Sequence, residues 1–313
     1  MMHYFLRKLL RLVLILLLVA VVTFLLLNLL PGDVALALLG NEATPAAIAQ
    51  VRAELGLDQP LILRFLNWLI GFTHGDLGRS YITQVPVMES IIDRIPVTIE
   101  LLLLSQGLAL LLAVPAGVLC AYKAGSRIDR LISSAAMLLL AAPVFITAIM
   151  LMFLFSLKLR LLPSTGYIPF NTNPTSNLEH LALPALAIGL SEWPSLFAVL
   201  RADMIKTLQQ DYIALARAKG LHPAFILLRH ALRPSSFTLV TISGLQIASA
   251  IVGALVVETI FGLPGVGRLL TGAVYNRDMV LVQGCVALIS VGYVLINFGV
   301  DLIYVLLDPR IRQ

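Results

Sequence analysis

The chain of 313 residues is 59% hydrophobic and only 12% charged, and its mean hydropathy is +0.95. Because soluble domains carry about 25% charged residues, this composition excludes an ordinary soluble protein and indicates a membrane protein. The 22 basic residues exceed the 17 acidic ones, but cytoplasmic loops of membrane proteins commonly supply such an excess, so we expect no nucleic-acid partner. Cys120 and Cys285 are the only cysteines and lie in separate apolar runs, which excludes a disulfide framework or a clustered thiolate metal site.

Six apolar stretches, each long enough to cross a bilayer, predict an all-α membrane protein with six transmembrane helices. They lie at residues 12–30, 99–121, 132–157, 181–200, 238–261 and 279–307. The first follows Arg7, Lys8 and Arg11, and Pro31-Gly32-Asp33 comes after it in place of a small-residue cleavage site. We therefore interpret it as a retained helix and not as a cleaved signal peptide.

The distribution of basic residues predicts the orientation. Fourteen of the 22 lie in the segments that are cytoplasmic if the N-terminus is inside, namely 1–11, 122–131, 201–236 and 308–313. The remaining eight are spread over a greater length on the other side. The positive-inside rule therefore favours a multi-pass protein of a bacterial-type plasma (inner) membrane, with both termini in the cytoplasm.

The predicted organisation has four parts: 1–30 is the N-terminal end with the first span, 31–95 is extracytoplasmic, 96–307 holds five further spans, and 308–313 is a cytoplasmic tail. Within the extracytoplasmic part, Thr44 before Pro45 predicts a helix start and Gly56 a helix stop, which indicates a small helical segment. Turn signals around Gly71 to Gly78 precede a second short apolar piece, Val87 to Ile95, that leads into the second span.

The cytoplasmic stretch between the fourth and fifth spans has a distinct pattern. Apolar residues at helical spacing, Met204, Ile205, Leu208, Tyr212 and Leu215, predict one amphipathic helix over residues 201–220. Gly220 after Lys219 predicts its C-terminal end, and Pro223 predicts the first turn of a second helix through Ile226 to Leu232. Such a basic helix–turn–helix segment, held between two spans, is suited to binding a partner.

This stretch, Asp211-Tyr212-Ile213-Ala214-Leu215-Ala216-Arg217-Ala218-Lys219-Gly220 with Leu228-Arg229-His230-Ala231, resembles the EAA loop of ABC importer permeases of the dipeptide, oligopeptide and nickel family. Other motifs resemble that family in the same order along the chain. They are Leu30-Pro31-Gly32-Asp33, Leu55-Gly56-Leu57-Asp58, Gly75-Asp76-Leu77-Gly78-Arg79-Ser80, Pro96-Val97-Thr98-Ile99-Glu100, Val256 to Arg268, Asn276-Arg277-Asp278 and Asp301 to Arg312. The chain departs from the family pattern at Ala214, Leu215 and Pro234-Ser235, where glutamate, threonine and an Asn-Ala pair are usual.

The resemblance implies a type I ABC importer permease fold and import of a small hydrophilic solute, di- or oligopeptides first, with nickel or a metal chelate as the alternative. It implies as partners a homologous second permease, two ATP-binding subunits, an extracytoplasmic solute-binding protein and the lipid bilayer. ATP and magnesium would be bound by the ATP-binding subunits, so this chain would hold no cofactor, no metal and no catalytic residue. Residues 203–235 would couple ATPase motion to the spans, through Asp211, Tyr212, Ala214, Ala216, Arg217, Ala218, Lys219, Gly220 and His230.

Polar residues within or at the edges of the apolar stretches are candidates for function, because such groups are costly in a bilayer unless they face a cavity or a partner. Gln106, Glu192 and Gln246 are the candidates for a polar translocation path. Structural or gating roles are predicted for Glu100, Glu258, Asp278 and Asp301. For Glu100, Glu258 and Asp301, a structural tie is favoured over contact with the solute. Pro115, Pro143 and Pro184 permit a kink or a break.

Several alternatives are less consistent with the residues. The five histidines are far apart in the chain, so no nickel site is visible. An ion-coupled secondary carrier would carry mid-span carboxylates in repeated pairs, and only Glu192 approaches this. An intramembrane hydrolase is also less consistent with the sequence, because it would require a nucleophile with a base inside the spans. Because no Gly-x-x-x-x-Gly-Lys-Ser/Thr phosphate loop occurs, ATP must be handled by another subunit.

Overall fold

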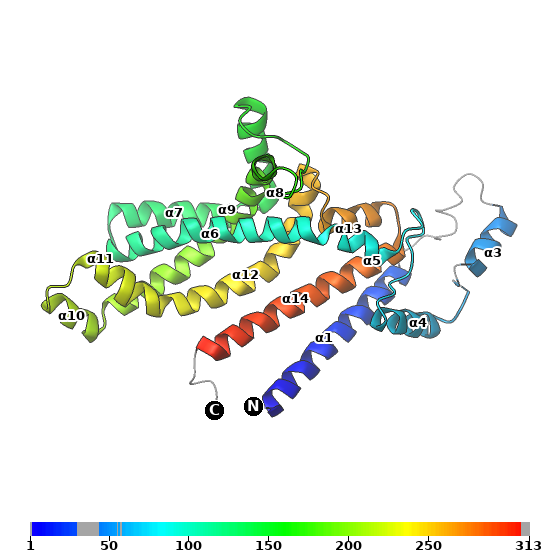
Figure 1. Cartoon of the computed structure of the whole chain (residues 1–313), viewed down its shortest axis with the longest axis horizontal. Helices are drawn as coiled ribbons and strands as arrows, with labels where there is room; N and C mark the ends of the chain where they lie inside the picture. The colour runs from blue at the N-terminus through cyan, green and yellow to red at the C-terminus, as the bar shows by residue number, and fades with distance from the viewer. Residues whose placement is uncertain (1, 30–43, 55, 57, 308–313) are drawn as a thin grey trace. The chain divides into compact units, whose positions relative to one another are not determined.

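A computed structural model of the chain describes residues 2–29, 44–54, 56 and 58–307 (Figure 1). The regular structure of these residues is helical, apart from one isolated antiparallel bridge between Arg79 and Pro86. The chain folds as two compact units, which are residues 1–97 with 264–294, and residues 98–263 with 295–313. The predicted all-α class is confirmed for the described residues, whereas the predicted tail 308–313 and residues 30–43 lie outside them.

The first unit contains α1 (Met2–Leu29), α3 (Pro45–Glu54), α4 (Leu61–Thr73), α5 (Val87–Ile92), α13 (Val266–Tyr275) and the first part of α14 (Met279–Leu307). The Thr44 hydroxyl accepts a hydrogen bond from the Ala47 amide at 3.2 Å, as the predicted helix start requires. The sequence analysis predicted neither α4 nor α13: it assigned turns around Gly71 to Gly78 and no element to residues 266–275. Leu77, Val87, Ile91 and Cys285 belong to the buried core of this unit.

The second unit contains α6 (Ile95–Tyr122), α7 (Arg127–Ala141), α8 (Val144–Leu151), α9 (Pro174–Leu208) and α12 (Leu232–Phe261). Helix α9 contacts α7, α8 and α12, and its buried residues Trp193, Phe197 and Leu200 belong to the core. Figure 1 shows α10 (Asp211–Ala218) and α11 (Pro223–Phe225) together at the ends of α9 and α12. This unit therefore places the candidate coupling segment directly at the end of its helical core.

Four helical segments are long and apolar enough to cross a membrane: Val87–Tyr122, Pro174–Leu208, Pro223–Phe261 and Met279–Val300. A fifth crossing is possible only if two bent helices count as one span. Helix α1 offers a shorter apolar stretch, Leu10–Leu26, within the residues searched. The structure thus gives four or five candidate spans by length and composition, and the predicted number of six is not confirmed.

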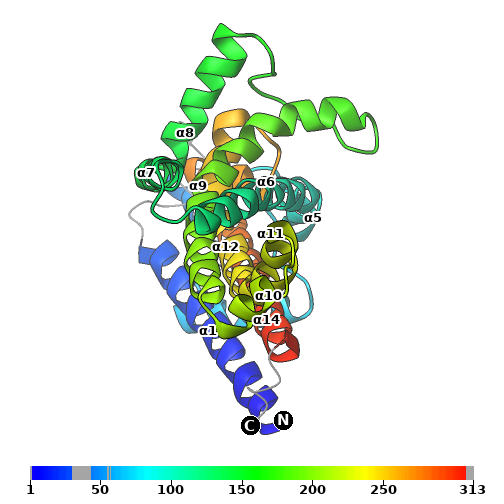
Figure 2. The same cartoon turned by 90° about the vertical axis from the view of Figure 1, so that its left-hand side faces the viewer.

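The predicted third span, 132–157, is not one straight helix. Helix α7 ends at Ala141, and α8 with the π-helix η2 (Met152–Lys158) leaves it at an angle of 104° (Figure 2). Pro143 lies at the break, because its ring locks the backbone and the residue before a proline avoids the helical region. In contrast, Pro115 and Pro184 lie inside continuous helices, so only Pro143 produces a break.

Candidate functional site

The single helix predicted over residues 201–220 is divided in the structure between the end of α9 and the separate helix α10. Helix α9 ends at Leu208, and α10 begins at Asp211 after Gln210, whose backbone is extended (ψ 149°). The Gln210 carbonyl accepts hydrogen bonds from the Ile213 and Ala214 amides at 3.0 and 3.3 Å. The apolar periodicity did not predict this break, because the spacing of apolar side chains does not indicate where the backbone turns.

The end of α10 agrees with the prediction for Gly220. Its φ of +73° is left-handed, its amide donates to the Arg217 carbonyl at 2.9 Å, and the Leu221 amide donates to the Ala216 carbonyl at 3.3 Å. These two bonds form a Schellman motif, which satisfies carbonyls that the helix end leaves without partners. The turn after α10 therefore depends on a residue that accepts a left-handed backbone.

The faces of α10 are reversed relative to the prediction. Ile213 is fully buried and Ala216 nearly so, and both pack with Ile226 and Leu208 in a small core. Tyr212 and Leu215, which the periodicity assigned to the apolar face, are 46% and 57% exposed. The prediction was wrong here because the break at Gln209–Gln210 changes which side of α10 faces the helical core.

The predicted second helix does begin at Pro223, but it does not end at Leu232. Helix α11 passes through the π-helix η3 (Ile226–Ala231) directly into α12, so one helical run covers Pro223–Phe261. The Tyr212 hydroxyl reaches the His230 carbonyl at 3.4 Å, and the His230 ring lies edge-on to Phe225 with centroids 5.4 Å apart. These contacts join α10 and α11 to η3, the helical turn that precedes α12.

A cavity of about 720 Å³ lies behind α10, between the end of α6 and the turn that follows α10. Arg217 is among the residues that line it, together with Tyr122, Ile205, Leu208, Leu221 and Ile226. Of the other predicted coupling residues, Asp211, Ala214, Ala218 and Lys219 are exposed on α10 or at its end. The structure thus places all the predicted coupling residues except His230 on α10 or directly after it, with His230 on η3 in contact with Tyr212, and their coupling role stays a prediction.

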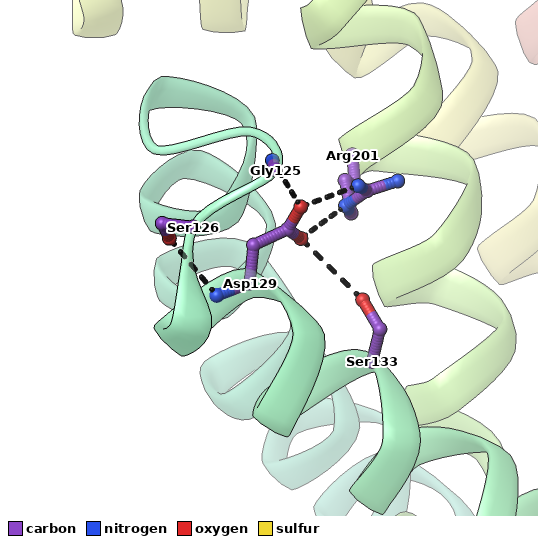
Figure 3. Close-up of polar contacts among 5 residues, drawn as sticks. All are labelled: Gly125, Ser126, Asp129, Ser133 and Arg201. Carbon is purple, nitrogen blue, oxygen red and sulfur yellow. Dashed lines mark hydrogen bonds and ion pairs between the residues drawn. The ribbon is translucent and has the colours of Figure 1, made fainter.

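An ion pair that the sequence analysis did not predict joins α7 to α9 close to this segment (Figure 3). Arg201 Nε and Nη2 each donate to one carboxylate oxygen of Asp129 at 2.6 Å. The same carboxylate accepts the Gly125 amide at 2.9 Å, and the Ser126 hydroxyl caps α7 at the Asp129 amide. The Asp129 side chain is only 3% exposed, so this contact fixes α9 two turns before the coupling segment.

The candidate path residues lie among helices of the second unit. Gln246 on α12 donates from Nε2 to the Glu192 carbonyl of α9 at 3.2 Å. Glu192 Oε2 and Gln246 Oε1 are buried without a hydrogen-bond partner. Gln106 on α6 is 6% exposed, and neither of its amide atoms has a hydrogen-bond partner. Ser243, which the sequence analysis missed, is a fourth such residue, and its single hydroxyl on an apolar helix gave no distinctive signal.

Two candidate structural carboxylates of the second unit make specific contacts. Glu258 is fully buried and accepts a hydrogen bond from the Thr98 hydroxyl at 2.6 Å. Glu100 accepts one from the Tyr167 hydroxyl at 2.9 Å. Burial, together with the hydrogen bond to Glu100 and its charge, raises the pKa of Tyr167 to about 12, so the phenol stays a donor at physiological pH. Both contacts are of the kind that a structural tie requires.

In the first unit, Asp278 connects two of the family-like motifs. It accepts a hydrogen bond from the Ser80 hydroxyl and caps the start of α14 at the Leu281 amide, 3.3 Å away. It also accepts the Tyr81 amide at 3.3 Å. Asp301 lies on α14, but its side chain is outside the described residues. Among the described part of the chain, no group of three His, Cys, Asp or Glu side chains is placed to hold a metal ion.

An all-helical chain with several bilayer-length apolar helices, and a short helix–turn–helix segment between two of them, is a multi-span membrane protein of the permease type. The chain belongs to the family described as the binding-protein-dependent transport system inner membrane component, which matches residues 113–313. Residues 1–102 match the N-terminal region described for the same transport systems. The chain is therefore the membrane permease of an ABC importer.

Relatives named for a transport function are similar over almost the whole chain. A putative peptide transport system permease protein of Brucella abortus is 40% identical, with 95% of each chain covered. A probable peptide ABC transporter permease of Sinorhizobium fredii is 37% identical (99% of each chain), and a glutathione transport system permease of Pectobacterium atrosepticum is 36% identical (100% of this chain, 99% of the relative).

Solved structures support the fold at lower identity. The MetNI methionine ABC transporter in an inward-facing conformation matches with a TM-score of 0.56 at 17% identity, over 71% of this chain and 97% of that one. An amino acid ABC transporter crystallised with histidines matches with a TM-score of 0.53 at 14% identity, over 69% of this chain and 93% of that one. At these identities the likeness concerns the fold alone.

Proposed function

We propose that this permease imports di- or oligopeptides as one of two homologous membrane subunits of an ATP-driven transporter. The support for peptides comes from three relatives at 36–40% identity, which are named for peptide or glutathione transport. Nickel or a metal chelate gains no comparable support, since none of these relatives is named for a metal. An extracytoplasmic solute-binding protein delivers the cargo, as the family description implies.

The observation that carries the mechanism is the exposed apolar face of α10. Tyr212 and Leu215 point away from the core, while Ile213 and Ala216 attach the helix to it. In this proposal two ATP-binding subunits bind ATP and magnesium, and one of them receives this face in a groove. The chain itself holds no cofactor and performs no covalent chemistry.

Closure of the ATP-binding subunits then pulls on α10 and changes the packing of the spans from inward-open to outward-open. ATP is thus the ligand that shifts the spans between two conformations. Two connections carry the motion: the continuous helix from Pro223 to Phe261, and the short link from α10 back to α9. Gln106, Glu192 and Gln246 contribute to the polar path in this proposal, since each has a buried polar atom without a partner.

The proposed topology has six spans with both termini in the cytoplasm. Helix α1 and the bent pair α7–α8 supply the two crossings beyond the four clear ones. The excess of basic residues in segments 122–131 and 201–236 supports the cytoplasmic placement of α10. This placement puts the coupling segment on the side where ATP is available.

The test is co-purification of the tagged chain from its native membrane, with identification of the recovered subunits. We expect a second permease and ATP-binding subunits with the wild type, and loss of the ATP-binding subunits with Leu215→Asp. Val274→Asp on α13 is the matched control, because Val274 is also 57% exposed and should leave the complex intact. Recovery of ATP-binding subunits with Leu215→Asp at the wild-type level would contradict the docking role of α10.

A further inference from the structure

The second unit contains a cavity of about 420 Å³ between α6, α12 and α14, apart from the coupling segment. Aliphatic side chains form most of its wall, including Leu110, Leu239, Ile247 and Val300. Gln106 and Ser243 also line it and supply its buried side-chain polar groups. No Asp, Glu, Lys, Arg or His is among the described residues that line it. Its size is within the range of small-molecule sites, which are mostly apolar with a few polar groups that orient the ligand.

The polar atoms in this cavity have no partners within the protein. Gln106 is 6% exposed, and both Nε2 and Oε1 are buried without a hydrogen bond. Ser243 is 8% exposed, and its Oγ is likewise buried and without a partner. Buried polar groups are almost always hydrogen-bonded. An amide that faces a cavity with neither of its polar atoms hydrogen-bonded therefore indicates a ligand that supplies the missing hydrogen bonds.

We propose that this cavity is a subsite for a peptide bond of the imported solute, an inference that rests on the proposed peptide transport. A primary amide presents a donor and an acceptor in one plane, and a peptide bond presents the complementary acceptor and donor. Gln106 Nε2 donates to the carbonyl oxygen of the peptide bond, and Gln106 Oε1 accepts its N–H. Ser243 supplies a further donor or acceptor, and the aliphatic wall receives the adjoining apolar part of the solute.

The surroundings argue against other ligands. A metal ion would require carboxylate, imidazole or thiolate ligands, whereas the polar side chains here are the amide of Gln106 and the hydroxyls of Thr241 and Ser243. A lipid chain would leave the Gln106 amide unsatisfied. The charged termini of a peptide would find no counter-charge among the lining residues, so the subsite recognises the neutral backbone and not the ends. Glu192 and Gln246 are not among the lining residues and belong to a separate part of the path.

The test uses the complete transporter, with both permeases, the ATP-binding subunits and the solute-binding protein, in proteoliposomes. Initial uptake is measured for a labelled tripeptide and for analogues in which each peptide bond in turn carries an N-methyl group in place of its N–H. The selectivity is the ratio of uptake of the parent peptide to that of an analogue. Any effect of methylation on capture by the solute-binding protein is the same for every permease variant, so it cancels when variants are compared.

We expect Gln106→Met, which preserves shape but removes the amide, to lower the selectivity at one bond about tenfold, as the loss of two hydrogen bonds predicts. Gln283→Met is the matched control, since Gln283 is also a buried glutamine with an unpartnered Nε2 but lines a different cavity, in the first unit. Its selectivity should equal that of the wild type. Ser243→Ala should lower the selectivity about threefold, and it serves as the second variant if Gln106→Met does not assemble.

The outcomes separate this inference from the proposed function. If the wild type imports the tripeptide with ATP but Gln106→Met and Ser243→Ala retain the wild-type selectivity, the cavity holds only water and the subsite is wrong. If the wild-type transporter imports no peptide at all, the proposed peptide transport is wrong and the subsite with it. A tenfold loss of selectivity confined to Gln106→Met and not seen with Gln283→Met supports the subsite.

Discussion

Arg201 and Asp129 form a two-point ion pair that ties α9 to the first turn of α7, with both N···O distances at 2.6 Å. Arg201 lies only seven residues before the end of α9 at Leu208, and α10 follows after a two-residue break. The pair therefore anchors the base of the coupling segment to the α6–α7 turn, whose Gly125 amide donates to the same carboxylate.

We expect Arg201→Met to lower the free energy of unfolding by about 1–3 kcal/mol, because it leaves the buried Asp129 carboxylate without its charged partner. Arg201→Lys should lose less, since lysine keeps the charge but not the two-point geometry. Thermal unfolding of the purified protein in detergent measures both. Lys206→Met is the control, because Lys206 is 76% exposed and its 3.8 Å pair with Asp203 contributes little. Equal stability of Arg201→Met and wild type would show that the pair is not an anchor.

Gly220→Val should uncouple ATP hydrolysis from import without preventing assembly. The left-handed φ of +73° at Gly220 is costly for a β-branched residue, even though no atom lies within 4 Å of the added Cβ. Peptide imported per ATP hydrolysed, measured in proteoliposomes, should fall several-fold. Gly220→Asn should retain most coupling, since asparagine tolerates this conformation. A normal ratio for Gly220→Val would mean that the turn geometry does not matter for coupling.

Gly244→Ala should destabilise the second unit by about 1–3 kcal/mol. A Cβ at Gly244 would lie 2.1 Å from Val300 Cγ2, and the stiff β-branched Val300 has little freedom to move aside. Gly253→Ala on the same helix is the matched control, because nothing lies within 4 Å of its added Cβ, and it should be neutral or slightly stabilising. Thermal unfolding in detergent distinguishes them, and equal melting temperatures for the two variants would argue against close packing of α12 on α14.

Tyr167→Phe should cost about 1 kcal/mol by removing the hydrogen bond to Glu100. Because the pKa of Tyr167 is raised to about 12 from an ordinary value near 10, its contribution is fully present below pH 10 and is lost as pH rises towards 12. The difference in melting temperature between wild type and Tyr167→Phe should therefore be constant from pH 6 to 9. A difference that disappears within that range would contradict the assigned hydrogen bond.

Several features of the candidate site were predictable from single residues. Gly220 ends α10 because only a residue that accepts a left-handed backbone suits that turn, and Pro223 begins α11 because a first-turn position needs no amide donor. Thr44 caps α3 for a similarly local reason. In contrast, the exposed and buried faces of α10 were assigned wrongly, because the break at Gln209–Gln210 turns Ile213 and Ala216 towards Ile226, which lies beyond the turn.

The sequence by itself determined the membrane class, most of the long helices and the local ends of the coupling helix, because hydropathy, helical period and capping act between residues that are near in the chain. Only the tertiary structure decided that Arg201 meets Asp129, that Ser80 meets Asp278, and that Gln106 and Ser243 share a cavity. These pairs are separated by 72, 198 and more than 100 residues, and no local rule specifies such partners. The bend of 104° at Pro143 also required the structure, because a proline permits a break but the neighbouring helices determine its angle.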